Sequence, residues 1–119
     1  ETSPSNTILY HRVEGQGLEK QNSGSTSDVF TYNLDQNYPN PFNPSTKIKF
    51  QIPKSSTVAQ TFLYVYDILG REIAILVNQQ LQPGTYEVEW DATNYPSGVY
   101  FYTLRNSKFT ETKKLMLIK

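Results

Sequence analysis

Strict alternation of polar and apolar residues, the period of a half-buried β-strand, recurs in short segments after Leu34 and restricts what this chain can fold into. Residues 47–52, Lys-Ile-Lys-Phe-Gln-Ile, alternate without a fault, and Pro53 ends the segment. Residues 85–90 repeat the pattern with an aromatic and apolar inward face. That face carries Tyr86, Val88 and Trp90. Such segments predict strands that turn one side toward a core.

Turn signals divide the chain after Leu34 at intervals of about 8–12 residues. The predicted strands are residues 34–38, 47–52, 58–68, 73–77, 85–90, 99–105 and 108–118. In the turn from Asp67 to Gly70, the aspartate can accept backbone hydrogen bonds and the glycine tolerates a positive φ. No segment has the period of an amphipathic helix. We therefore expect an all-β fold, an immunoglobulin-like β-sandwich of about seven antiparallel strands.

The 119 residues leave room for one domain. Residues 34–119 form the expected sandwich domain. Residues 1–33 have the composition of a linker or of the end of an upstream domain, because short polar stretches dominate them. Residues 8–13, Ile-Leu-Tyr-His-Arg-Val, could form one strand, so an additional edge strand is the alternative.

Composition excludes several classes of partner and site. Eleven basic and eleven acidic residues cancel, so no electrostatic reason favours nucleic acid or an anionic membrane as a partner. The chain contains no cysteine, which removes disulfides, thiol nucleophiles and cysteine metal sites. No apolar run approaches the ~20 residues that cross a bilayer. The first residues do not resemble a signal peptide, so an exported protein would carry one upstream of Glu1.

The residues that enzymes and metal sites need are scarce. His11 is the single histidine, and no serine has the context of a catalytic triad. Glu87 and Glu89 alternate outward, where a solvated charge is the ordinary interpretation. A calcium site built on Asp67 and Asp91 is conceivable, but acidic turn residues more often accept backbone hydrogen bonds. We expect no enzyme activity, no metal and no cofactor.

Residues 37–44, Asn-Tyr-Pro-Asn-Pro-Phe-Asn-Pro, are the most distinctive stretch of the sequence. Its prolines cannot donate to a strand ladder, and each favours extended geometry in the residue before it. Asn40 and Asn43 can cap their own turns with side-chain oxygens. Tyr38 and Phe42 are expected to pin a stiff, irregular segment onto the sandwich, so we predict a structural role.

Five blocks occur in a fixed order along the chain: LDQNYPNPFNPSTKIKFQIP, VYDILGREI, PGTYEVEWDA, SGVYFYTL and TKKLMLIK. Together they resemble the C-terminal sorting domain of the type IX secretion system of Bacteroidetes and related bacteria. The resemblance covers Leu34 to Lys119. The fold is also similar to the immunoglobulin-like domain of flagellar hook-capping proteins.

This resemblance implies a sorting signal rather than a catalyst. Members of the family reach the periplasm through an upstream signal peptide, and the outer-membrane translocon then recognises the domain. A sortase-like peptidase usually removes it, and the cargo is released or attached at the cell surface. The expected partners are therefore the translocon, the peptidase and an upstream cargo domain.

The resemblance also implies roles for individual residues. The candidates for recognition by the translocon are Lys113, Lys114, Leu115, Leu117 and Lys119. The alternative for the lysines is an edge strand that charge protects from aggregation. The family motif residues expected to be mainly structural are Pro39, Pro41, Phe42, Asp67, Gly70, Arg71, Gly98 and Tyr100.

Parity along residues 58–68 places Phe62, Tyr64 and Tyr66 on the outward side, where the family is normally polar. Val99 and Phe101 also face away from the expected core. If these strands are neighbours, they form an apolar patch of the kind found at interfaces. We expect this patch to be covered by residues 8–13, by an upstream domain or by a second copy of the chain.

Two other functions remain open from the residues alone. A structural or carbohydrate-binding accessory domain of a secreted enzyme could use surface aromatics, namely Tyr64, Tyr66, Tyr95 and Phe101. An assembly subunit similar to a hook cap would require ordered self-association. The sequence does not identify the cargo.

Overall fold

The computed structural model describes residues 10–12, 31–54 and 59–119. Within these ranges the chain forms eight strands and no helix, and thus no helix that could span a membrane. The strands are β1 (Tyr10–Arg12), β2 (Asn33–Leu34), β3 (Ser45–Ile52), β4 (Ala59–Tyr66), β5 (Glu72–Leu81), β6 (Gly84–Asp91), β7 (Gly98–Asn106) and β8 (Phe109–Leu117).

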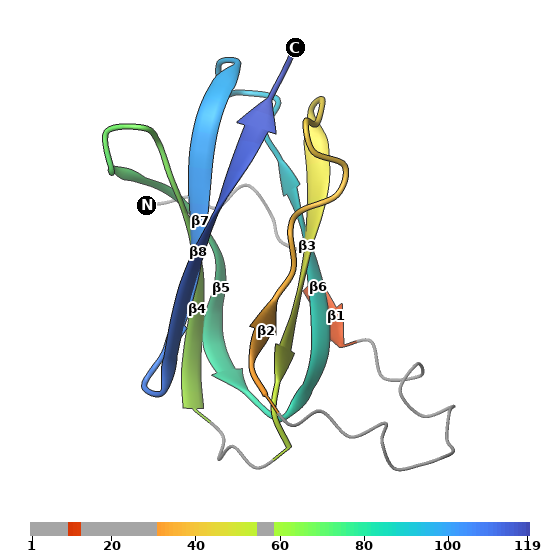
Figure 1. The fold of residues 1–119 in the computed structure, drawn as a ribbon, viewed down its shortest axis with the longest axis vertical. Helices are drawn as coiled ribbons and strands as arrows, with labels where there is room; N and C mark the ends of the chain where they lie inside the picture. The colour runs from red at the N-terminus through yellow and green to blue at the C-terminus, as the bar shows by residue number, and fades with distance from the viewer. Residues whose placement is uncertain (1–9, 13–30, 55–58) are drawn as a thin grey trace.

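Two sheets of four strands face each other (Figure 1). The first sheet has the order β1-β6-β3-β2 and the second has the order β5-β4-β7-β8. All strand pairs in both sheets are antiparallel. Taken with the chain order, this arrangement matches that of immunoglobulin-like sandwiches, with β1 beyond β6 as the outermost strand. The all-β sandwich expected from the sequence is confirmed.

The core lies between the sheets and follows the predicted alternation. In β3 the side chains of Ile48, Phe50 and Ile52 are buried. In β6 the inward face of Tyr86, Val88 and Trp90 is buried, as predicted. Trp90 is fully enclosed, and its ring lies 5.8 Å from Phe42, 5.4 Å from Tyr95 and 5.6 Å from Tyr100 between centroids. This aromatic cluster joins strands of both sheets.

β5 is longer than the predicted segment 73–77, because its pairing with β4 continues to Leu81. Two register shifts interrupt this pairing. The shifts act as β-bulges, and Leu76 and Val77 are both buried although they are consecutive. Bulges explain why the segment is apolar on both faces. The polar residues that follow, Asn78 to Gln80, continue the strand opposite β4.

β1 is the first described strand of the chain. It pairs antiparallel with the outer edge of β6 in the register Tyr10↔Val88. The rest of the segment 8–13, and most of residues 1–33, lie outside the described residues. β2 is shorter than predicted. After Leu34 the chain contacts β3 through the Asp35 N–H, which donates to the carbonyl of Lys49 at 2.9 Å, and through an isolated bridge from Tyr38 to Lys47.

Candidate recognition surface

The last strand, β8, lies at the edge of the second sheet, with only β7 as its neighbour in the sheet order. Leu115 and Leu117 point into the core and are 0% and 1% exposed. Their neighbours Met116 and Ile118 are 38% and 50% exposed. The two leucines therefore hold β8 in the sandwich, so their side chains are not available to a partner of the folded domain.

The three lysines near the end of the chain lie at the surface. Lys113 is half-buried and forms an ion pair with Glu111 at 3.5 Å between Nζ and Oε2. Lys114 is exposed. The Lys119 ammonium donates to the carbonyl of Thr93 at 2.5 Å, and its backbone N–H donates to Ser97 Oγ at 2.9 Å. These contacts tie the last residue to the loop before β7.

Residues 37–44, here called the proline strap, run along the outer edge of β8. Phe42 N–H donates to the carbonyl of Met116 at 2.9 Å, and Ile118 N–H donates to the carbonyl of Phe42 at 3.0 Å. Met116 N–H donates to Asn40 Oδ1 at 3.0 Å. Just before the strap, Gln36 Nε2 donates to the carbonyl of Lys114 at 2.7 Å. The strap thus satisfies edge groups that would otherwise be open to another strand.

The other side of the strap is anchored to the first sheet. Asn37 is 2% exposed, and its Nδ2 donates to Thr46 Oγ1 at 2.9 Å and to the carbonyl of Pro39 at 3.0 Å. Phe42 is 2% exposed and enters the core, as predicted. Tyr38 is 79% exposed, so the prediction that it pins the strap is wrong; the buried Asn37 amide does so instead. Pro39 and Pro41 stay at the surface.

Asn40 of the strap also acts differently from expectation. We predicted that Asn40 caps its own turn, but its side-chain oxygen accepts from Met116, 76 positions later in the chain. Neither this contact nor that of Gln36 with β8 has a local sequence signal. The one sequence feature that could have indicated the Asn40 contact is the position of an asparagine between prolines, which have no backbone N–H to donate.

The turn between β4 and β5 has the predicted chemistry. Asp67 Oδ1 accepts from the backbone N–H groups of Leu69 at 2.9 Å and Arg71 at 3.0 Å, and Oδ2 accepts from Arg71 Nε at 2.8 Å. These bonds, first the one from the Arg71 backbone, lower the pKa of Asp67. Gly70 has φ +85°, which glycine adopts at little cost. Ile68 and Leu69 project from this turn, 69% and 74% exposed.

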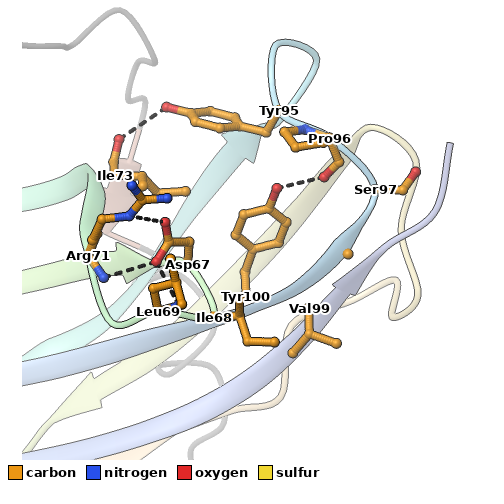
Figure 2. A pocket seen from close by; sticks show the side chains of 11 residues that line it. Asp67, Ile68, Leu69, Arg71, Ile73, Tyr95, Pro96, Ser97, Val99 and Tyr100 are labelled. Carbon is orange, nitrogen blue, oxygen red and sulfur yellow. Dashed lines mark hydrogen bonds and ion pairs between the residues drawn. The ribbon is translucent and has the colours of Figure 1, made fainter.

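A pocket of about 450 Å³ lies between this turn and the start of β7 (Figure 2). Four of the family motif residues line it: Asp67, Arg71, Gly98 and Tyr100. Tyr100 Oη donates to the carbonyl of Pro96 at 2.6 Å, in the manner of the tyrosine corner of immunoglobulin-like domains. Tyr95 Oη donates to the carbonyl of Ile73 at 3.1 Å. The polar side chains of the pocket thus bond to the loops around it.

The motif blocks, distant in sequence, meet at one end of the sandwich (Figure 1). Ala92 N–H donates to the carbonyl of Pro44 at 2.8 Å, which joins the end of the strap to the loop after β6. Lys119 reaches the same loop through Thr93 and Ser97. The strap, the pocket and the end of β8 therefore form one continuous region. Asp91 nearby accepts from Thr93, which lowers the pKa of its carboxyl.

The outward aromatics of β4 lie as parity predicts. Phe62, Tyr64 and Tyr66 are half-buried, with centroids 5.4 Å apart for the first pair and 6.0 Å for the second. Arg105 Cζ lies 5.1 Å from the centre of the Tyr64 ring. Phe101 of β7 is opposite Tyr66. β1 pairs with β6 in the other sheet, so those residues do not cover this face.

Comparison with protein families gives a match to the description "secretion system C-terminal sorting domain" over residues 36–119. A comparison with curated protein sequences gives no match. The matched region contains the proline strap, both turns of the pocket and all of β8. It covers well over half of the chain, and β1 and β2 lie outside it. The chain thus belongs to the family of C-terminal sorting domains that act as the export signal for type IX secretion.

Proposed function

We propose that the type IX machinery reads this domain in its folded state, at the end of the sandwich where β8, the proline strap and the Asp67–Arg71 turn meet. The family is recognised by that machinery while attached to a cargo, and it carries no catalytic activity. The observation that supports the location is the convergence of the motif blocks at this end. Recognition through a folded surface needs groups that are exposed and held in place, and Lys119 is exposed and bonded to Thr93 and Ser97.

Within this region we assign recognition to the side chains of Lys113, Lys114 and Lys119. Leu115 and Leu117 contribute through the core, because they hold β8 in register with β7. The strap leaves the lysine side chains accessible while it satisfies the strand edge. A charged, rigid edge of this kind favours specific capture over nonspecific strand pairing.

The cargo would precede this domain in the same protein. β2 begins at the end of the sandwich away from the end of β8 (Figure 1). β1 comes earlier in the chain and runs antiparallel to β6, so it starts nearer the end where β8 finishes. We further propose that the protein passes through the periplasm and that a sortase-like peptidase removes the domain. The cargo is then delivered to the cell surface or the medium.

The experiment is an export assay in a bacterium that has the system. A signal peptide and a folded reporter are placed before the whole 119-residue chain. We expect the reporter at the cell surface or in the medium. A triple change of Lys113, Lys114 and Lys119 to Glu should leave it in the periplasm.

A matched control changes Lys47 and Lys49, exposed lysines of β3 in the other sheet, to Glu. This control should be exported. If both variants are exported equally and both fold, the lysines do not mediate recognition. If the unchanged chain itself stays in the periplasm, the sorting role is wrong for this sequence.

The carbohydrate-binding alternative gains no support from the described residues. Phe62 and Tyr64 stack on each other with an interplanar angle of 7°, and Arg105 lies against both rings.

A further inference from the structure

The outer face of the second sheet has an aromatic centre and a polar border. Its apolar and aromatic members come from all four strands: Phe62, Tyr64, Tyr66, Ile75, Val99, Phe101 and Met116. Gln60, Asn78 and Gln80 border it at one end. An apolar centre with a polar rim is the usual composition of a protein–protein interface.

One row across this face carries opposite charges at its two ends. The strand registers align Glu72 with Tyr66, Tyr66 with Phe101, and Phe101 with Lys114. Glu72 and Lys114 thus stand on the outermost strands, β5 and β8, separated by three strand spacings or about 14 Å. Neither forms an ion pair with another residue in the described part of the chain, and both are exposed.

We infer that this face binds a second copy of the same chain, with the two sheets packed face to face about a twofold axis parallel to the strands. Such an axis exchanges the two edges of the sheet. Glu72 of one copy then faces Lys114 of the other, and the pair forms twice. The aromatic centres of β4 and β7 meet between the two ion pairs.

The next rows are compatible with the same operation. Phe62 is aligned with Arg105, so the exchange places the guanidinium of one copy over the Phe62 ring of the other. Arg105 already lies 5.8 Å from the Phe62 ring of its own copy, so the guanidinium would be shared between two rings. The net charge of zero also removes long-range repulsion between copies.

Glu72 lies outside the residues assigned to recognition by the secretion machinery, so dimerisation and export can fail separately. Lys114 belongs to both surfaces, and a dimer would cover it. The two uses of Lys114 are therefore mutually exclusive, and recognition would require the monomer.

The test is sedimentation equilibrium of the whole chain and of three variants: Glu72→Lys, Lys114→Glu and the double exchange. Each single change places like charges opposite each other twice, and we expect it to raise the dimer dissociation constant about tenfold or more. The double exchange should restore the original value, because the pair is re-formed with reversed signs. As a control, Glu89→Lys on the other sheet should leave the constant unchanged.

Within one copy, Glu72 and Lys114 are too far apart to interact directly, so rescue by the double exchange reports contact between copies. A chain that sediments as a monomer even at millimolar concentration overturns the inference. A dimer whose dissociation constant is unchanged by the single substitutions also overturns the inference, because that dimer uses another face. Export of the Glu72→Lys chain in the reporter assay should be normal whichever result is obtained.

Discussion

The backbone N–H of Phe42 donates to the carbonyl of Met116 at 2.9 Å, and this bond joins the proline strap to the last strand of the sandwich. The side chain of the same Phe42 is buried against Trp90, with centroids 5.8 Å apart. One residue therefore covers the edge of β8 and fills the core beneath it. The strap is a fixed part of the fold because removing it would expose both.

Phe42→Ala should be the most damaging single change in the strap. Truncating a buried aromatic side chain costs about 3–5 kcal/mol of unfolding free energy. Urea denaturation followed by Trp90 fluorescence measures this loss, and Trp90 is the only tryptophan of the chain. Tyr38→Ala, at a side chain 79% exposed, is the control and should change the unfolding free energy by less than about 0.5 kcal/mol. Equal losses would mean that the strap does not depend on the buried ring.

Asn40→Ala should open the edge of β8 locally. The change removes the acceptor of the Met116 N–H, which costs about 1 kcal/mol and exposes that amide to solvent. Hydrogen exchange of the Met116 amide should become faster, whereas that of Leu115, which faces β7, should be unchanged. Asn43→Ala serves as the matched control. If the Met116 amide exchanges at the same rate in both variants, the Asn40 bond does not protect the edge.

Asp67 should make part of the free energy of unfolding depend on pH in the acid range. Its hydrogen bonds with Arg71 and Leu69 lower the pKa of the folded state below the ordinary value of 3.8. The stabilisation is therefore present above about pH 4 and is lost as the pH falls through the lower folded value. The urea midpoint of Asp67→Asn should fall less than that of the unchanged chain between pH 5 and strong acid. If the urea midpoints of the two chains change with pH in parallel, the Asp67 carboxylate does not contribute to the pH dependence of stability.

Gly70→Ala should destabilise the turn through backbone conformation alone. A Cβ at this position would meet no atom within 4 Å, so the cost arises from the φ of +85°. We expect a loss of about 1 kcal/mol in unfolding free energy. Gly70→Asn should lose less, because asparagine enters the left-handed region more easily than alanine. An equal effect of the two substitutions would point to a cause other than φ.

Tyr100→Phe tests the corner that closes the pocket. Its hydroxyl bonds to the Pro96 carbonyl at 2.6 Å, and the ring packs on Trp90. We expect a loss of about 1 kcal/mol, with faster hydrogen exchange confined to residues 93–98. An unchanged unfolding free energy would show that ring packing alone holds this loop.

Much of this protein could be predicted from short-range patterns. Alternation identified the buried faces of β3 and β6, because a strand has a period of two and only one face is buried. The Asp67–Gly70 turn was predictable since its hydrogen bonds link residues at most four positions apart. Parity also placed Phe62 and Tyr64 outward on β4.

Tertiary structure alone decided the rest. One bulge of β5 arises where the sheet must accommodate both Leu76 and Val77 in the core, and a strand period of two does not predict it. Asn37 takes the anchoring role expected of Tyr38, because its buried amide found a partner, Thr46, on β3. The contact of Asn40 with Met116 depends on which distant segments become neighbours. That choice follows from the packing free energy of the whole sandwich, so no local stretch of sequence carries it.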